Sequence, residues 1–354
     1  MVSAAIKNIF PYELVREGQE SLIDDATLAL QEGKVLIAHA PTGLGKTASA
    51  LVVAVDKALE KKKMVFFLTN RHTQHHIAIE TLKLMRTRKQ INVPVVDMIG
   101  KKWMCSQTVA NLFGNEFNEY CKTIVEKGEC EYYNNVRENK KGLRVEAKAF
   151  LKELKNDGPL HTKEVMEGCA AKKMCAYELS LGMAKEAVVL IGDYNYLFNP
   201  FVQSTIFNKL EKEMEDIILV VDEGHNLPSR ISEMLSTSLS TFMIKNAIQE
   251  AKKYNYGGLI IWLQELMSIL TLLADFSDKE FDRERKVNRD YFMGLVRAKV
   301  DYDNLINELE MAADEVRKKQ QKSFLGGIVT FLESWKGEDE GYMRYIAEKQ
   351  SKYG

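Results

Sequence analysis

The sequence predicts an α/β protein built on a parallel sheet, and three observations support this fold class. Residues 35–38 are an apolar run that precedes a glycine-rich loop, as expected of a buried strand. Apolar residues then recur at helical spacing over residues 47–61. Further apolar runs that predict strands lie at 64–69, 187–191 and 217–221. Strands that alternate with helices in this way are typical of a parallel sheet covered by helices.

Residues 40–47 match the phosphate-binding loop pattern in its expected strand–loop–helix setting. Gly43 and Gly45 permit a close backbone approach, so that N–H groups at the helix N-terminus can cradle phosphate oxygens. Lys46 is expected to reach the β- and γ-phosphates and the Thr47 hydroxyl to bind Mg²⁺. Ala40 replaces the first glycine of the strict pattern, which changes the subclass of loop rather than its ligand. The sequence therefore predicts a site for a nucleoside triphosphate such as ATP.

A second acidic motif follows the apolar run at 217–221. Asp222 and Glu223 lie where the strand ends, and ligands bind at the carboxyl ends of strands in open α/β sheets. Asp222 is the expected outer ligand of Mg²⁺, and Glu223 the candidate base that orients the attacking water. His225 could couple this site to other segments. The alternative is an acidic pair that only caps the next helix.

Composition sets wider bounds. A chain of 354 residues predicts two or three domains, and a net charge of −1 means that nucleic acid would have to bind at local basic patches. No signal-peptide pattern begins the sequence, and the most apolar stretch, 257–276, is interrupted by Gln264 and Glu265. We therefore expect a cytoplasmic protein that does not span a membrane.

The five cysteines all lie within one segment of about 70 residues, at 105, 121, 130, 169 and 175. In a cytoplasmic chain, cysteines indicate metal or redox chemistry more than disulfides. No C-x-x-C pair is present, so the spacing matches neither a zinc ribbon nor a ferredoxin. By spacing alone, scattered buried thiols and a metal site both remain open, and clustering between two parts of an ATPase core favours metal.

The expected organisation has four parts. A first α/β part spans 1–100, a cysteine-bearing insertion 101–178, a second α/β part 179–236, and a helical segment 237–354. Within the helical segment 237–354, apolar residues are spaced to line one face of a helix. They are Leu305, Ile306, Leu309, Ala312, Ala313 and Val316.

Several motifs together resemble the XPD-type DNA helicases of superfamily 2. Phe10, Tyr12, Arg16 and Gln19 resemble the family's adenine-reading Q-motif, and residues 68–74 its DNA-backbone contact motif Ia. Residues 193–198 resemble a strand-end signature of the family, and 222–227 its Asp-Glu-Ala-His-Asn-Leu motif, with Gly224 in place of alanine. The resemblance implies a RecA-like P-loop ATPase core, an inserted iron–sulfur domain and a helical arch.

The resemblance also interprets the cysteines. It implies that four of them hold a 4Fe–4S cluster, namely Cys105, Cys121, Cys130 and Cys175. Cys169 matches no ligand of the family and is expected to be a bystander. Four thiolates could also hold zinc.

The resemblance implies an ATP-driven DNA helicase of DNA-repair type, moving 5′ to 3′ on single-stranded and forked DNA. Candidate DNA contacts are Arg71, Lys101, Lys102, Arg137, Trp103, Tyr132 and Tyr133, which offer cations to phosphates and flat faces to bases. The chain stops within the helical segment, before any second motor domain, so we expect the N-terminal portion of a helicase that turns over poorly alone. The rival interpretations are an incomplete iron–sulfur module that binds DNA and nucleotide, and a small-molecule kinase.

Overall fold

The computed structural model describes the chain except for residues 1–3, 112–113, 139–141, 277–282, 321–322 and 349–354. It divides into two compact units, residues 1–235 and 236–354. Each unit has its own hydrophobic core and is described here by itself.

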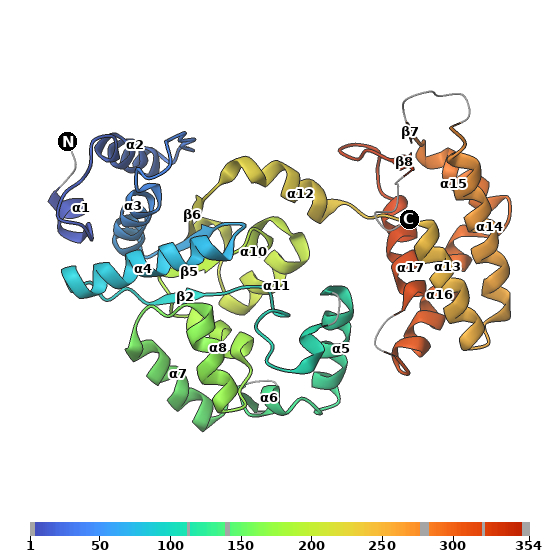
Figure 1. Ribbon diagram of the computed structural model, residues 1–354, viewed down its shortest axis with the longest axis horizontal. Coiled ribbons are helices and arrows are strands. Elements are labelled where there is room, and N and C mark those ends of the chain that lie inside the picture. Colours follow the sequence, from blue (N-terminus) through green and yellow to red (C-terminus); the bar gives the residue numbers. More distant parts are fainter. Residues whose placement is uncertain (1–3, 112–113, 139–141, 277–282, 321–322, 349–354) are drawn as a thin grey trace. The chain divides into compact units, whose positions relative to one another are not determined.

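A parallel sheet of four strands forms the centre of the first unit (Figure 1). The strand order is β2-β5-β1-β6, with β1 (Met64–Leu68) and β5 (Val189–Gly192) inside and β2 (Val95–Asp97) and β6 (Ile217–Val221) outside. Phe66 of β1 lies opposite Leu190 of β5 and Leu219 of β6. The α/β class and the strands expected at 64–69, 187–191 and 217–221 are confirmed, each within two residues at its ends. The strand β2 was not anticipated.

Helices cover both faces of this sheet. Alternate residues of β1 point to opposite faces, so that Val65 and Phe67 pack in one core cluster and Phe66 and Leu68 in the other. The first cluster includes residues from α1 (Ala4–Ile9), α2 (Gln19–Glu32), α3 (Lys46–Lys61) and α4 (His72–Lys89). The second includes residues from α7 (Val145–Asp157), α8 (Thr162–Ala171), α9 (Ala176–Ala184), α10 (Asn195–Phe198) and α11 (Pro200–Leu210).

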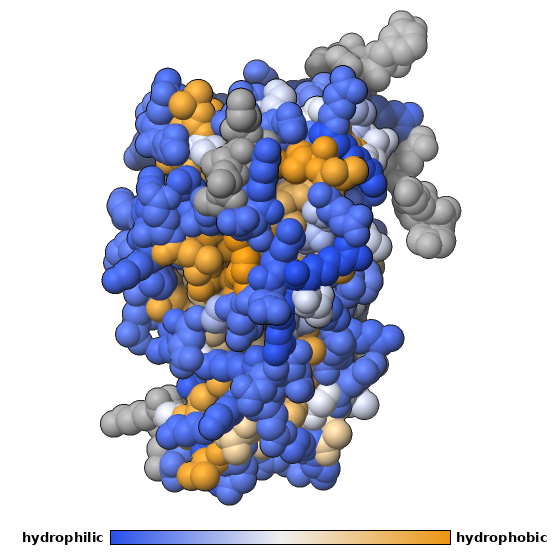
Figure 2. All heavy atoms as spheres, turned by 90° about the vertical axis from the view of Figure 1, so that its left-hand side faces the viewer, coloured by the Kyte–Doolittle hydropathy of each residue, from blue (hydrophilic) through white to orange (hydrophobic). Residues whose placement is uncertain are grey.

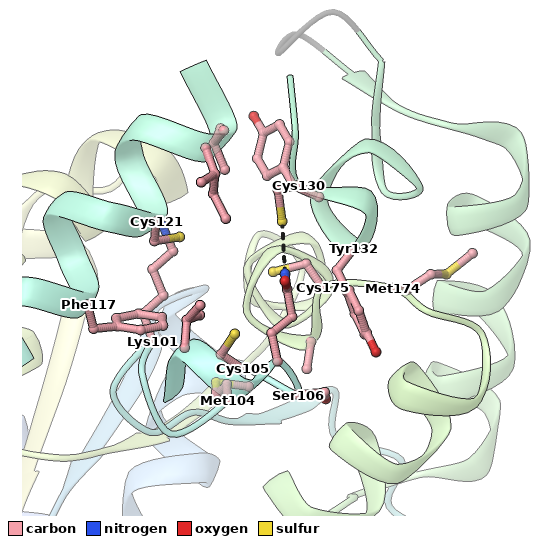
Figure 3. Close-up of a pocket in the computed structure, with 16 residues that line it drawn as sticks. Lys101, Met104, Cys105, Ser106, Phe117, Cys121, Cys130, Tyr132, Met174 and Cys175 are labelled. Carbon is pink, nitrogen blue, oxygen red and sulfur yellow. Dashed lines mark hydrogen bonds between the residues drawn. The ribbon is translucent and has the colours of Figure 1, made fainter. Parts of the chain in front are cut away.

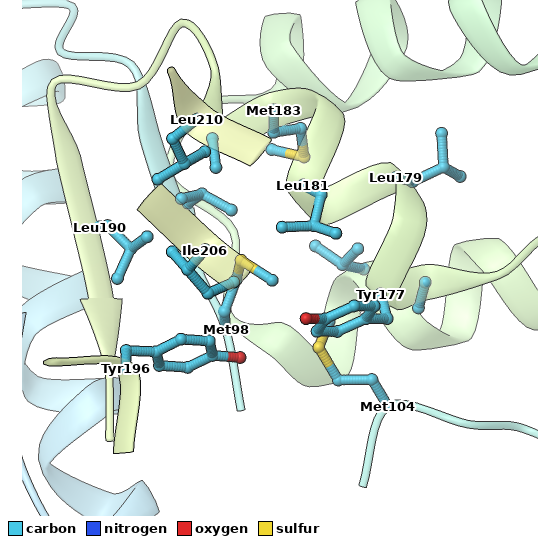
Figure 4. Close-up of a cluster of buried hydrophobic side chains, with 14 of the residues drawn as sticks. Met98, Met104, Tyr177, Leu179, Leu181, Met183, Leu190, Tyr196, Ile206 and Leu210 are labelled. Carbon is cyan, nitrogen blue, oxygen red and sulfur yellow. The ribbon is translucent and has the colours of Figure 1, made fainter. Parts of the chain in front are cut away.

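The cysteine-bearing segment shares the second cluster with the sheet. Figure 4 shows Met104 and Tyr177 of this segment in one cluster with Leu190 of β5 and Ile206 of α11. The Tyr196 hydroxyl donates to the Ile99 carbonyl at 2.8 Å. The remaining elements of the unit are the helices α5 (Gly114–Glu126), α6 (Glu131–Asn134) and α12 (Leu227–Leu235), the antiparallel pair β3 (Arg137–Glu138) and β4 (Gly142–Leu143), and three short 3₁₀ turns at Thr108–Asn111, Met214–Asp216 and Gly224–Asn226.

The strand predicted at 35–38 is not formed, and this prediction was wrong. Val35 is 89% and Ile37 92% exposed, and residues 34–40 have no regular structure. An extended segment needs a neighbour to pair its N–H and C=O groups. In the sheet that the structure describes, β6 pairs with β1 on one side and no strand pairs with its other edge. Residues 34–40 therefore do not join this sheet as a strand. Figure 2 shows several separate apolar patches on a mostly hydrophilic face of the molecule.

The second unit is helical apart from a small ribbon. Its helices are α13 (Thr241–Lys253), α14 (Gly257–Leu273), α15 (Arg289–Arg297), α16 (Tyr302–Arg317) and α17 (Phe324–Trp335). All six apolar residues expected on one face of α16 are buried, which confirms that pattern. The antiparallel pair β7 (Glu284–Lys286) and β8 (Tyr345–Ala347) was not anticipated. None of the helices in the described ranges is both long and apolar enough to cross a bilayer.

Candidate functional site

The glycine-rich loop leads directly into α3. Gly43 and Gly45 both have left-handed backbones, with φ of 84° and 89°, and Gly45 caps α3. A Cβ at Gly45 would lie 2.2 Å from the Gln19 side-chain nitrogen, so this position requires glycine on two grounds. The Lys46 ammonium donates to the Ala40 carbonyl at 2.9 Å, folding back over its own loop. Thr47 lies in the first turn of α3, where free N–H groups favour an anion.

The Q-motif residues split between the loop and the core. Gln19 is 3% exposed, lies against Gly45, and accepts from the Arg16 backbone N–H at 2.8 Å. The Arg16 guanidinium donates to the Gly43 carbonyl at 3.1 Å, so these two residues hold the phosphate loop. Phe10 is buried among the first helices and supports Tyr12, whose ring meets it edge-on at 5.9 Å. Tyr12 is 41% exposed and is the aromatic face that a base could reach.

The acidic motif stands at the carboxyl end of β6. The Asp222 N–H continues the sheet by donating to the Leu68 carbonyl at 2.8 Å. Burial and the neighbouring Glu223 raise the pKa of Asp222 above its usual range, while the Lys46 ammonium lowers it. The Lys46 ammonium is thus near enough to Asp222 to influence the pKa of that carboxyl. His225 is exposed and lies 3.4 Å from the Glu223 carboxylate.

Tyr194 holds the backbone of the acidic motif. Its hydroxyl donates to the carbonyl of Asp222 at 2.5 Å and lies 3.0 Å from that of Glu223, and the residue is 1% exposed. Glu223 has a left-handed backbone with φ of 53°, which is unusual for a residue with a side chain. The sequence pattern at 193–198 gave Tyr194 no role.

Motif Ia follows β1 and opens α4. Arg71 and His72 are exposed, whereas Thr69 is buried. Among the described residues, the Thr69 hydroxyl and the Asn70 side-chain amide oxygen are buried without a hydrogen-bond partner. Arg71 is the exposed cation of this segment, and it lies beside the first turn of α4.

Four of the five cysteines line one cavity, and Cys169 is elsewhere. Figure 3 shows Cys105, Cys121, Cys130 and Cys175 around this cavity, together with Lys101 and Phe117. The Gln107 amide donates to the Cys130 sulfur at 3.3 Å. Burial raises the pKa of Cys175 to about 12, so this thiol keeps its proton until a metal displaces it. Cys169 is fully buried within α8, and burial raises its pKa to about 12 as well.

The four cysteines of this cavity are the side chains that could hold a metal group. Among the residues that the structure describes, no three His, Cys, Asp or Glu side chains are arranged to hold a single metal ion. In a 4Fe–4S cluster each of the four irons takes one cysteine thiolate, so the four cysteines would surround the cluster instead of meeting at one ion. Four cysteines line one mainly apolar cavity, whereas a single zinc ion would need all four around one point.

The candidate DNA contacts differ in their availability. Trp103 is 60% exposed, with the Lys102 ammonium 4.7 Å from its ring. Arg137 is bound to the buried Glu178 at 2.7 Å, and Lys101 lies at the cysteine cavity. Tyr132 and Tyr133 also line that cavity. Arg71 and Trp103 are therefore the exposed candidates in the described ranges, and Lys102 is half-buried against the Trp103 ring.

A parallel sheet with a phosphate loop and an acidic strand end at its carboxyl edge defines a P-loop NTPase core. The DEAD_2 family matches residues 67–244, half of the chain, and the protein belongs to this family.

Two curated relatives are similar to this chain over about a third of their own length. The chain is 27% identical over 240 residues to the ATP-dependent DNA helicase XPD of Sulfolobus acidocaldarius, covering 67% of this chain and 37% of the relative. It is 26% identical over 257 residues to the ATP-dependent DNA helicase DinG of Salmonella choleraesuis, covering 66% and 35%. The chain thus spans about a third of the length of these relatives.

Solved structures agree on the fold. The chain matches a structure titled "XPD_Helicase" with a TM-score of 0.60 and 23% identity, over 91% of this chain and 51% of that one. It matches one titled "Truncated XPD" with a TM-score of 0.59 and 22% identity, over 89% and 82%.

Proposed function

We propose that this chain is the nucleotide- and DNA-binding part of an ATP-dependent DNA helicase of the XPD type. The observation that carries the proposal is the convergence of the Lys46 loop and the Asp222 strand end in a member of the DEAD_2 family. Mg²⁺–ATP would lie with its phosphates on the first turn of α3 and its metal between Thr47 and Asp222. Glu223 would orient the attacking water, and His225, beside it, would link the site to the rest of the motor.

DNA is proposed to bind as a single strand at exposed cations and rings. Arg71 and His72 open α4 beside the sheet end, and Trp103 offers a face on which a base can stack. Movement 5′ to 3′, preference for forked DNA, a role in repair and a cytoplasmic location belong to this proposal by resemblance to the XPD type. The supporting relatives are ATP-dependent DNA helicases by name.

ATP hydrolysis by the 354-residue chain, with and without single-stranded DNA, tests the motor proposal. Lys46→Ala is the matched control, because it removes the ammonium and keeps the loop backbone. Turnover that rises with DNA and is lost in Lys46→Ala is expected of the motor. Tight binding of DNA and nucleotide without turnover would favour the alternative, an incomplete binding module. Turnover that rises only with a small-molecule acceptor would refute both.

We further propose that the four cysteines of the cavity hold a 4Fe–4S cluster. Bound there, it would supply a covalent cross-link between α5, α6 and the start of α9 and a one-electron redox centre. Protein purified without oxygen should be brown and contain about four irons per chain. Cys175→Ser should lose this iron and Cys169→Ser should keep it. Colourless protein that carries one zinc per chain would refute the cluster.

A further inference from the structure

A buried carboxylate outside both sites ties the sheet to the cysteine-bearing segment. Asp97 ends β2 and is 1% exposed. One of its oxygens lies 2.6 Å from His75 Nδ1 of α4. The other accepts from the Thr162 N–H at 2.8 Å, and the Thr162 hydroxyl donates to the Asp97 carbonyl at 3.1 Å. The first turn of α8 is therefore fixed to the end of β2 by Asp97.

His161 completes this joint and caps α8. Its Nδ1 accepts from the Lys163 N–H at 3.2 Å, while the Glu164 carboxylate accepts from the His161 N–H. Because Nδ1 is an acceptor, the neutral ring carries its proton on Nε2, which lies 3.7 Å from the Asp97 carboxylate. A proton taken from solvent at Nδ1 would convert the acceptor into a donor facing the Lys163 N–H. The cap cannot survive that change.

The charged and titratable groups around His161 determine whether its pKa is raised or lowered. Asp97 faces it from β2, His75 and His76 face it from α4, and Glu164 lies on its own helix, bound in turn to Lys83 of α4. Burial and the two histidines lower the pKa of His161, outweighing the carboxylates. The released segment therefore binds the proton more readily than the docked one, so acid favours release.

The position of α8 bears on the cysteine cavity. At the end of this helix the Cys169 carbonyl accepts from the Met174 N–H at 2.8 Å. The next residue, Cys175, donates its N–H to the Tyr132 carbonyl at 3.0 Å and begins α9. The far end of α8 is thus linked by backbone hydrogen bonds to the stretch that carries the last cysteine of the cavity.

We propose that Asp97 and His161 form a proton-sensitive joint that docks α8 on the sheet and releases its first turn in acid. The joint stands on its own contacts and does not depend on the presence of a cluster or on helicase activity.

Hydrogen exchange of the Thr162 and Lys163 amides at pH 7.5 and 5.5, corrected for intrinsic exchange, tests the joint. With an ordinary histidine pKa of 6.5 in the released state, protection should fall by up to about tenfold at pH 5.5. His161→Asn keeps an N-capping oxygen but does not titrate in this range, so its protection should be the same at both pH values. Asp97→Asn should lower protection at pH 7.5.

His39→Asn changes an exposed histidine in a different segment and should behave like the wild type. If His161→Asn does not fold, His161→Ser supplies the same kind of cap. A wild type without an acid-induced loss, or a loss that persists in the non-titrating variants, would overturn the proposal.

Discussion

Replacing Tyr194 with phenylalanine isolates the hydroxyl that holds the acidic motif. The ring stays in the core, where the residue is 1% exposed, and only the oxygen is removed. The Asp222 and Glu223 carbonyls, at 2.5 and 3.0 Å, lose their shared donor. Glu223 would then be freer to leave its left-handed backbone, φ 53°.

The expected magnitude follows from these contacts. One neutral hydrogen bond contributes about 1 kcal/mol, and a left-handed residue with a side chain stores about 1 kcal/mol of strain. The free energy of unfolding of the first unit should therefore fall by about 1 kcal/mol. If the carboxylates shift and the same energy is lost from binding, Mg²⁺-dependent nucleotide affinity should fall by roughly fivefold, since about 1 kcal/mol corresponds to that factor.

The assay measures binding of a fluorescent ATP analogue with Mg²⁺ and with EDTA, beside urea unfolding. Tyr196→Phe is the matched control, because its hydroxyl donates to the Ile99 carbonyl at 2.8 Å, away from the acidic motif. Tyr196→Phe should lose comparable stability and keep its Mg²⁺ response. Equal Mg²⁺ responses in the two variants would refute the positioning role of Tyr194.

Three further perturbations address the rest of the chain. Glu250→Ala removes the carboxylate that accepts from the Phe324 and Leu325 N–H groups at 2.6 and 3.2 Å. In thermal unfolding this variant should destabilise the second unit by about 2–3 kcal/mol, more than Glu250→Gln does. Equal losses in the two variants would contradict this role of the carboxylate. Gly45→Ala should abolish nucleotide binding with an unchanged circular-dichroism spectrum, and normal binding would show that the loop tolerates a Cβ. The raised pKa of Asp222 means that the folded chain holds this proton more tightly than the unfolded one, so stability is lost as pH rises through that pKa and Mg²⁺ binding restores it. Mg²⁺-dependent affinity should therefore weaken on acidification, with a midpoint above the ordinary carboxyl pKa of 3.8, and a midpoint at or below 3.8 would contradict the raised pKa of Asp222.

The local sequence predicted the structure correctly where the conformation or burial of a residue depends on its neighbours along the chain. Gly43 and Gly45 have the backbone that the loop pattern predicts, and the apolar face of α16 is buried as its spacing indicates. The strand at 35–38 was predicted wrongly because an apolar run specifies an extended segment only if a neighbouring strand pairs with it.

Contacts between residues far apart in the sequence could not be predicted, because they also depend on partners outside the local pattern. Asp97 and Thr162 are 65 residues apart, and nothing in either local pattern indicates that β2 ends beside the first turn of α8. Tyr194 meets Asp222 across 28 residues, from one strand end to another. The separation of Cys169 from the other cysteines rested on family resemblance, whereas in the structure it follows from the helix in which Cys169 lies.

The outer edge of β6 has a practical consequence for work with this chain. In the described sheet its N–H and C=O groups face no further strand on that side, Leu219 is 41% exposed, and residues 35–38 leave apolar side chains in water. An unpaired strand edge is a template on which chains pair with one another, and exposed apolar side chains add to that tendency. Preparations should therefore self-associate with rising concentration, and a lysine at Leu219 should raise the concentration at which they stay monodisperse.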